Sequence, residues 1–178
     1  MHRTMVMTLL GPDRPGLVEA LAEKVQACDG NWLESRLCQL AGHFAGIVQL
    51  QLPEARAQEF EAALRALDAE MGLKCHLSIS DAGTGEGRLL TLDVIGQDRP
   101  GIVFAVTDIL AEFGVNVEAM DSVCESAPMS GESLFRARLR VRIPLDTDFS
   151  ALERRLTDIG DEMMLDVCLD RDLDRAAD

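Results

Sequence analysis

The chain has 178 residues, a formal net charge of −14 at neutral pH and an apolar fraction of 47%, which is ordinary for a globular protein. This charge repels a phosphate backbone, so the composition argues against direct nucleic-acid binding. No apolar run approaches the ~18 residues needed to cross a bilayer, and the chain opens on a strand-like segment rather than a signal peptide. We therefore expect a cytoplasmic protein without membrane association.

The cysteines and histidines are scattered. The five cysteines include no Cys-x-x-Cys pair, and the three histidines share no metal-ligand spacing. An odd number of dispersed cysteines predicts reduced, mostly buried thiols rather than a disulfide framework. The same pattern predicts no metal site, and nothing in the sequence calls for a cofactor.

The chain contains an internal repeat with a constant offset of 85 residues. Residues 10–18 read LGPDRPGLV, and residues 95–103 read IGQDRPGIV. After an insertion of six residues in the second copy, the two copies realign from Phe44 and Phe135 onward. Such self-similarity predicts two copies of one structural unit.

A glycine-rich segment separates the two copies. Residues 81–87 contain three glycines and two acids, a composition typical of flexible, solvated linkers. The sequence therefore predicts a first domain at 1–80, a linker at 81–87, a second domain at 88–170 and an acidic tail at 171–178.

Each copy begins with an apolar strand, at 3–10 and at 88–95, followed by a helix after Asp-Arg-Pro-Gly. The helices show apolar residues at helical spacing: Leu17, Leu21, Val25 and Cys28, then Ile102, Val106, Ile109 and Phe113. We expect the proline to occupy the first helical turn, where its missing N–H is not needed. The aspartate upstream, Asp13 or Asp98, is predicted to cap free amides of that turn.

Two strands then form a hairpin in each copy. The ranges are 31–41 and 43–52, turning at Gly42-His43, and 115–125 and 133–143, turning at 126–131. Apolar and polar side chains alternate along them, which predicts one buried and one polar sheet face. A second helix and a last strand, at 73–79 and 165–169, complete each copy. Ser150 and Glu153 have the spacing of a capping box at the start of the later helix.

The order strand, helix, strand, strand, helix, strand is the ferredoxin-like βαββαβ arrangement. The sequence therefore predicts an α+β protein of two tandem modules, each a four-stranded antiparallel sheet with two helices on one face. The other sheet face must be solvated, or covered by the sibling module or another subunit.

The Gly-x-Asp-Arg-Pro-Gly turn is the main candidate site. A helix N-terminus presents unpaired N–H groups and about half a positive charge, so it suits a carboxylate. Asn31 and Asn116, at the start of the next strand, are predicted to offer an amide to the same ligand. The alternative is a well-capped turn that binds nothing. Phosphate-loop and dinucleotide motifs are excluded, because Leu17-Val18 replace Lys-Ser/Thr and Gly-x-Gly-x-x-Gly is absent.

The doubled Asp-Arg-Pro-Gly in βαββαβ modules resembles paired ACT domains, which are regulatory modules that bind small molecules. GNWLESRL at 30–37, followed by AGHFAG at 41–46, resembles the glycine cleavage system transcriptional repressor family. The resemblance covers residues 1–170. It implies amino-acid binding at the turn after the first strand, by Asp13, Arg14, Pro15, Gly16 and Asn31, and by Asp98, Arg99, Pro100, Gly101 and Asn116.

The two copies differ at one position of this pattern. The second has the usual Gly-x-Asn as Gly114-Val115-Asn116, whereas the first has Asp29-Gly30-Asn31. Aspartate tolerates left-handed backbone, so we expect the turn to survive in the first copy.

The resemblance implies a regulator, not an enzyme, that senses glycine or a similar small amino acid and controls transcription of glycine cleavage genes. The acidic chain has no helix-turn-helix, so control is expected to act through a protein partner, a DNA-bound activator. Because many ACT proteins complete their sheets across subunits, a homodimer is expected. The alternative is a ligand-free ACT scaffold or dimerisation module that regulates another enzyme or transcription factor.

Three further features remain open. The row Arg136, Arg138, Arg140 and Arg142 would either dock a partner or pair within the sheet with Asp93, Asp166 and Glu118. Cys38 and His43 are the nearest approach to a catalytic pair, but they lack an orienting third group. Trp32, next to Asn31, is expected to lie beside the first site and to serve as a fluorescence probe.

Overall fold

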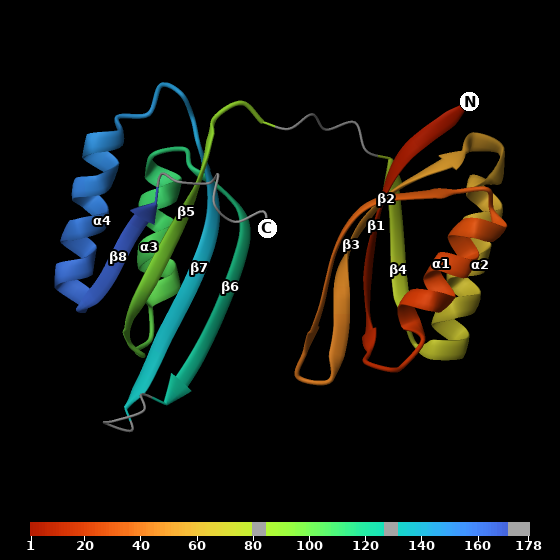
Figure 1. The fold of residues 1–178 in the computed structure, drawn as a ribbon, viewed down its shortest axis with the longest axis horizontal. Coiled ribbons are helices and arrows are strands. Elements are labelled where there is room, and N and C mark those ends of the chain that lie inside the picture. The colour runs from red at the N-terminus through yellow and green to blue at the C-terminus, as the bar shows by residue number, and fades with distance from the viewer. Residues whose placement is uncertain (80–84, 127–131, 171–178) are drawn as a thin grey trace. The chain divides into compact units, whose positions relative to one another are not determined.

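The computed structural model describes residues 1–79, 85–126 and 132–170. The chain divides into two compact units, Met1–Gly83 and Thr84–Asp178, and this division falls inside the predicted linker (Figure 1). Residues 81–84 of that linker, residues 127–131 of the predicted hairpin loop and the predicted tail lie outside the described residues.

The first module contains the six predicted elements in the predicted order. They are β1 (His2–Pro12), α1 (Leu17–Ala27), β2 (Asn31–Leu40), β3 (His43–Pro53), α2 (Ala57–Met71) and β4 (Lys74–Ile79). A short 3₁₀ turn, Glu54–Arg56, precedes α2. The sheet order is β2-β3-β1-β4, and every neighbouring pair is antiparallel.

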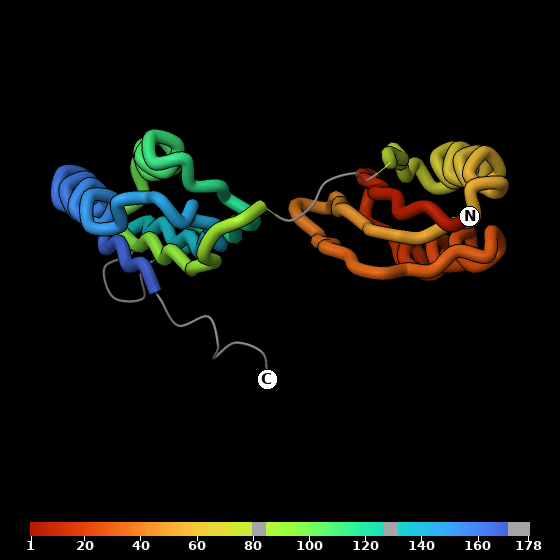
Figure 2. Tube along the Cα trace, turned by 90° about the horizontal axis from the view of Figure 1, so that it is seen from above, coloured from red at the N-terminus to blue at the C-terminus, as the bar shows by residue number. Residues whose placement is uncertain are grey.

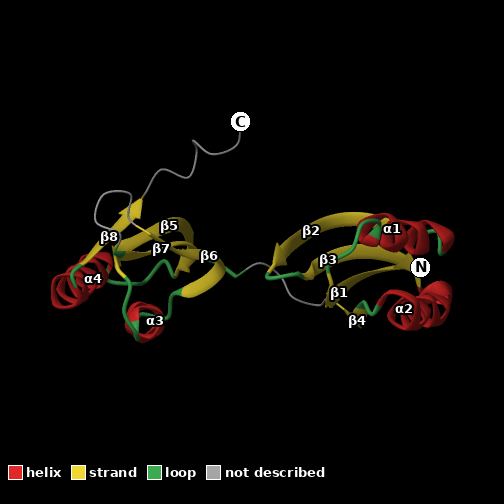
Figure 3. Cartoon of the chain, turned by 90° about the horizontal axis from the view of Figure 1, so that it is seen from below, coloured by secondary structure: helices red, strands yellow, loops and turns green. Residues whose placement is uncertain are grey.

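The second module repeats this arrangement. Its elements are β5 (Arg88–Gln97), α3 (Ile102–Glu112), β6 (Asn116–Ser126), β7 (Ser133–Ile143), α4 (Phe149–Met163) and β8 (Leu165–Asp170). The sheet order is β6-β7-β5-β8, again antiparallel throughout. In each module both helices lie on the same face of the sheet (Figures 2 and 3). The predicted fold class is confirmed.

Each module has its own apolar core between helices and sheet. The predicted alternation holds in β7, where Phe135, Ala137, Leu139, Val141 and Ile143 are all buried. The predicted helical stripes hold as well, because the apolar residues of α1 and α3 point at the sheet. Burying this apolar surface supplies the main favourable free energy of folding, because backbone polar groups are already paired in helices and ladders.

Two local predictions are wrong by one or two residues. The β2–β3 turn lies at Ala41-Gly42 rather than Gly42-His43, because a two-residue hairpin needs positive φ at both central residues, and these have φ of 50° and 80°. Helix α4 is capped by Asp148, whose Oδ1 accepts from the N–H of Ala151 at 3.0 Å. The predicted cap at Ser150 is wrong because the helix already starts at Phe149.

The left-handed residue before β2 survives in the first copy, as predicted. Asp29 has φ of 53°, and its counterpart Gly114 has φ of 66°. An aspartate accepts this conformation because its short polar side chain tolerates the left-handed region. The sequence difference between the copies at this position therefore leaves the backbone path unchanged.

The thiols are free, but they are more exposed than predicted. Cys28 is buried and Cys75 is half-buried, whereas Cys38, Cys124 and Cys168 are exposed. Burial, followed by the charge of Asp68, raises the pKa of the Cys75 thiol to about 11. The three exposed cysteines lie on β2, β6 and β8, each of which is an edge strand of its sheet.

No described helix is long and apolar enough to cross a bilayer.

Truncation of a core leucine should destabilise the protein strongly. Leu50, on β3, is fully buried, so we expect Leu50→Ala to lower the free energy of unfolding by about 2–5 kcal/mol through lost burial and a residual cavity. Urea denaturation followed by circular dichroism measures this. The matched control is Leu40→Ala, since Leu40 is 77% exposed; equal losses in the two variants would contradict the core assignment.

Candidate functional site

The first Asp-Arg-Pro-Gly turn joins β1 to α1 and ends in a left-handed glycine. Gly16 is the N-cap residue of α1, with φ of 88°, and its carbonyl accepts from the N–H of Ala20 at 2.9 Å. No atom lies within 4 Å of the position that a Cβ would take there. Glycine is therefore needed for its conformation rather than for space.

The predicted roles of proline and aspartate in this turn are wrong. The left-handed Gly16 separates Pro15 from the helix, so Pro15 precedes the cap instead of occupying the first helical turn. Among the described residues, no side chain caps the first amides of α1. Asp13 instead uses its backbone, whose N–H donates to the carbonyl of Gly42 at 2.9 Å. The amides at the start of α1 are thus left available to a ligand or to water.

The second turn has the same backbone. Gly101 has φ of 98° at the N-cap of α3, and its carbonyl accepts from the N–H of Ala105 at 2.9 Å. Within the described residues this helix also lacks a side-chain cap. The capping role predicted for Asp98 is therefore wrong, for the same reason as in the first module.

The side chain of Asp98 is tied to the β6–β7 hairpin. Its backbone N–H donates to the carbonyl of Ser133 at 2.8 Å, and the Ser133 hydroxyl donates to its Oδ2 at 3.3 Å. Desolvation, then the charge of Asp98 and a hydrogen bond to it, raise the pKa of the Cys124 thiol. The Asp98 carboxylate is thus already engaged inside its own module.

The Asp13 carboxylate lacks the corresponding hydrogen bond to the hairpin of its own module. In the first copy Gly42 takes the position of Ser133, so the hydroxyl donor is missing. Within the described residues Asp13 forms no side-chain hydrogen bond or ion pair. The two turns therefore share a backbone but differ in whether the carboxylate is free.

Asn31 lies far from the turn of its own module. In the β3 ladder, Pro12 at the end of β1 lies opposite His43, whereas Asn31 lies opposite Gln51. Eight residues of strand correspond to about 26 Å. The helix α1 runs back along the sheet, so it delivers the chain to the end opposite the turn. Within one module, the prediction that Asn31 contacts a ligand bound at the Asp-Arg-Pro-Gly turn is therefore wrong.

The second copy shows the same separation. Asn116 lies opposite Arg142 on β7, whereas the end of β5 lies opposite Leu134. Trp32 follows Asn31 and is half-buried against the first core, so it too lies away from the first turn. Each module groups the residues of one Asp-Arg-Pro-Gly turn and leaves its asparagine at the far end of the sheet.

The arginine row on β7 pairs within the sheet. Arg138 Nε lies 2.7 Å from Asp93, Arg140 Nε lies 3.7 Å from Glu118, and Arg136 Nε lies 3.4 Å from Glu125. Arg142 also pairs with Glu118. The in-sheet alternative is thus the one found, with Glu125 as a partner that sequence reasoning missed.

Asp166 is not a partner of this row among the described ion pairs. It lies on β8, which is separated from β7 by β5, so it is two strands away from the arginines. Asp93 on β5 and Glu118 on β6 are on neighbouring strands and reach them. Strand order, which the residue types do not reveal, decides which acids pair.

Among the hydrogen bonds of the described residues, none joins Cys38 to His43. Cys38 lies opposite Ala45 in the β2–β3 ladder, and His43 lies opposite Leu40. The Nδ1 atom of His43 lies 3.3 Å from the carbonyl oxygen of Ala41. Among the described residues, no group of three or more histidines, cysteines or acids could hold a metal ion.

Comparison with known proteins identifies the two modules. Models of the ACT domain match residues 3–78 and residues 90–161. The chain belongs to the ACT-domain family. Tandem ACT domains suggest a regulatory role with a small ligand, and the predicted resemblance to paired ACT domains is confirmed.

Two solved structures match nearly the whole chain. An unknown protein from Galdieria sulphuraria has a TM-score of 0.87 and 27% identity, covering 97% of this chain and 100% of that one. A provisionally named glycine cleavage system transcriptional repressor has a TM-score of 0.70 and 15% identity, covering 96% and 97%. At that identity the second likeness shows the fold. A search of curated proteins gives no match.

The contact between the Asp98 carboxylate and Cys124 on the hairpin predicts that removing the carboxylate changes the reactivity of this thiol. Removing the carboxylate with Asp98→Ala should lower the pKa of Cys124, because its negative charge opposes formation of the thiolate. Alkylation by iodoacetamide, followed at Cys124 by peptide mass spectrometry across pH, should then set in at lower pH. Asp13→Ala is the matched control and should leave the profile unchanged. An unshifted profile in Asp98→Ala would contradict the contact.

Proposed function

We propose that this protein is an amino-acid-sensing, non-enzymatic regulator that acts in the cytoplasm and controls transcription of glycine cleavage genes through a protein partner. Its ACT modules support ligand sensing. The likeness to a provisionally named glycine cleavage repressor, together with the segments at 30–37 and 41–46, supports the target genes. The ligand class that follows is glycine or a similarly small amino acid.

The observation that carries this proposal is the open first turn. The uncapped amides at the start of α1 suit the carboxylate of an amino acid, because a helix N-terminus favours negative charge. The free Asp13 carboxylate suits the ammonium group of the same molecule, and Arg14 is exposed beside it. A zwitterion therefore finds both complementary charges within one turn.

The second turn is the weaker candidate. Arg99, Pro100 and Gly101 offer the same backbone, but Asp98 is already bonded to Ser133. An ammonium group would have to share or displace that contact. Asn31 and Asn116 remain proposed contacts only for a ligand held by the turn of another module copy, since each lies far from its own.

Calorimetric titration with glycine and with serine tests the ligand site. We expect Asp13→Ala to weaken binding about tenfold or more, because hydrogen bonds to charged groups contribute about 1.5–3 kcal/mol. Asp98→Ala should have the smaller effect, and Asp161→Ala serves as an exposed acidic control on α4. Unchanged affinity in Asp13→Ala and Asp98→Ala would contradict the site. Absence of binding to the unaltered protein at millimolar ligand would favour a ligand-free ACT scaffold or dimerisation module.

Regulation through a partner predicts that the chain alone does not bind promoter DNA. With a net charge of −14, the chain is repelled by the phosphate backbone, and most strongly at low salt, where the charges are least screened. In an electrophoretic mobility assay, the purified protein should leave glycine cleavage promoter DNA unshifted. It should alter the mobility only when the DNA-bound activator is present. A shift by the purified chain would contradict the indirect mechanism.

We also propose that the protein acts as a homodimer. β2 and β6 are long edge strands, each paired on one side only within its sheet. ACT proteins of related architecture complete their sheets across subunits, which supports a second copy as a partner. A dimer also brings module copies near each other, as a ligand contacted by both a turn and an asparagine would require.

A further inference from the structure

Strand β4 is an edge strand of the first sheet, with one of its sides free. The sheet order β2-β3-β1-β4 gives β4 a single neighbour, β1, and Figure 3 shows β4 at the end of the sheet beside α2. On its other side, the backbone N–H and C=O groups of Lys74–Ile79 face no strand of the described module. Such an edge can accept a further strand, whose affinity comes from main-chain hydrogen bonds.

A groove with an apolar floor runs between β4 and α2. Leu64 of α2 is buried, and Cys75 and Leu77 of β4 are half-buried against the first core. Burial, followed by the charge of Asp68, raises the pKa of the Cys75 thiol to about 11, so this thiol is uncharged at neutral pH. The floor of the groove therefore suits apolar side chains.

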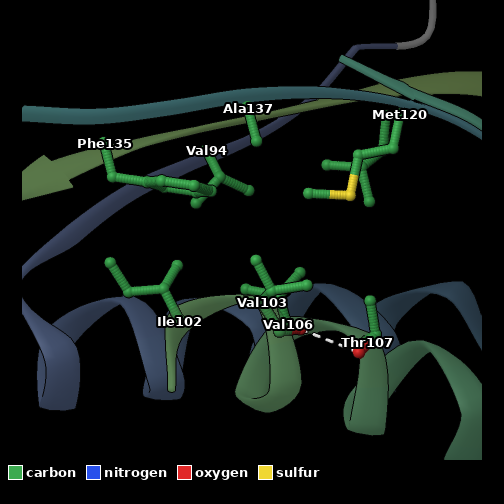
Figure 4. A pocket seen from close by; sticks show the side chains of 9 residues that line it. Val94, Ile102, Val103, Val106, Thr107, Met120, Phe135 and Ala137 are labelled. Carbon is green, nitrogen blue, oxygen red and sulfur yellow. Dashed lines mark hydrogen bonds between the residues drawn. The ribbon is translucent and has the colours of Figure 1, made fainter. Parts of the chain in front are cut away.

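The groove is far larger than the apolar hollow beneath α3. Figure 4 shows that hollow, where Ile102 and Val106 of the helix lie opposite Val94 and Ala137 of the second sheet. It holds about 10 Å³, the room of roughly one water molecule, so it admits no side chain. The groove beside β4 holds about 560 Å³ and opens to solvent, so side chains of a strand laid against β4 can enter it.

The exposed side chains of β4 include a cation that its neighbours do not neutralise. Lys74 and His76 are exposed, and they lie opposite the uncharged Leu10 and Thr8 of β1. The ion pairs described in the first module include neither of them. A carboxylate on an added strand would therefore find Lys74 available as a cross-strand partner.

The second module carries the opposite charge at the same edge. Asp166 and Asp170 of β8 occupy the repeat positions of Lys74 and Ser78 of β4. Both edges belong to the same fold, so the fold itself does not require a lysine there. Two carboxylates repel an acidic strand, whereas Lys74 attracts one. The edge that favours an acidic strand is thus a property of the first module.

We propose that β4 is a docking site for an extended segment of another protein in which apolar and acidic residues alternate. Successive side chains of a strand point to opposite faces of the sheet. The apolar side chains of the segment enter the groove over Leu64 and Leu77, and its acidic side chains lie beside Lys74 and His76. Asp68, at the rim of the groove, disfavours acidic residues on that side and so sets the register.

This inference goes beyond the proposed function. It assigns a docking surface and the chemistry of the segment that the surface accepts, whichever protein carries that segment. The net charge of −14 makes most of the chain repel an acidic segment. An unpaired lysine on a free edge strand therefore restricts where such a segment binds.

Calorimetric titration of the full chain with synthetic peptides tests the pattern. The probe is a blocked peptide of six residues, the length of β4, in which valine and glutamate alternate. We expect this peptide to bind. A peptide of alternating valine and lysine, and one of alternating serine and glutamate, should each bind about tenfold more weakly or less, because they lack the ion pair or the apolar burial. Absence of binding by the first peptide at millimolar concentration, or equal binding of all three, would overturn the proposal.

A charge reversal tests the lysine. Lys74→Glu should weaken binding of the valine–glutamate peptide about fivefold or more, because a repulsion replaces an attraction. Lys24→Glu, on α1 of the same module, changes the net charge equally and should leave the affinity unchanged. Circular dichroism establishes that both variants are folded. Equal losses in the two variants would reveal a general charge effect and overturn the site.

Hydrogen exchange locates the bound peptide. The peptide should slow amide exchange at residues 74–79 of β4 and leave residues 31–40 of β2, the other edge strand, unchanged. Protection confined to β2 would place the peptide on the other edge. Protection of β4 that rises with protein concentration in the absence of peptide would place a second copy there. Either result would overturn the assignment of β4 to another protein.

Discussion

The left-handed glycine at the end of each Asp-Arg-Pro-Gly turn constrains the rest of each module. Gly16 and Gly101 carry φ of 88° and 98°, a conformation that costs an ordinary residue about 1 kcal/mol or more. This backbone turns the chain from the central strand directly into a helix that lies on the sheet. It also excludes the preceding aspartate from capping, so the first helical amides face outward unpaired. One conformational requirement thereby fixes both the crossover and the electrostatics of the candidate site.

The duplication preserved this backbone while the side chains around it diverged. Asp98 is held by Ser133 in the second module, whereas the corresponding Asp13 faces a glycine-containing turn and stays free. The sheet of the second module carries a ladder of ion pairs on β7, where the β3 positions of the first are largely uncharged. Exposed ion pairs of this kind contribute little stability. The two modules thus share one backbone but differ in the side chains that flank the turn and cover the sheet.

The net negative charge of the chain affects which molecules it can associate with. Net charge does not determine the fold, but it suppresses encounters with nucleic acid and with other acidic surfaces. Association is then favoured at faces where the charge density is low or the charges are complementary. The same argument underlies an indirect mode of transcriptional control. The inference about association and the inference about indirect control both rest on the net negative charge of the chain.

The sequence by itself determined the repeat, the order of the elements and the buried face of each one. These features follow from local periodicity: two residues for a strand, 3.6 for a helix, and a constant offset between copies. Leu17, Leu21 and Val25 face the core because their spacing leaves no other common face. The Asp-Arg-Pro-Gly turns were identified as candidate sites for the same reason, since their chemistry is contained within a few consecutive residues.

Only the tertiary structure decided what depends on register and strand order. It placed Asn31 at the end of the sheet opposite its turn, because α1 carries the chain back along the full length of the strands. It showed that Arg136 forms an ion pair with Glu125. It also placed Asp166 two strands away from the arginines, because β5 lies between β7 and β8. It also joined Asp98 to Ser133, 35 residues away in the chain. Such contacts arise from distances across the sheet, and a pattern read along one chain does not contain those distances.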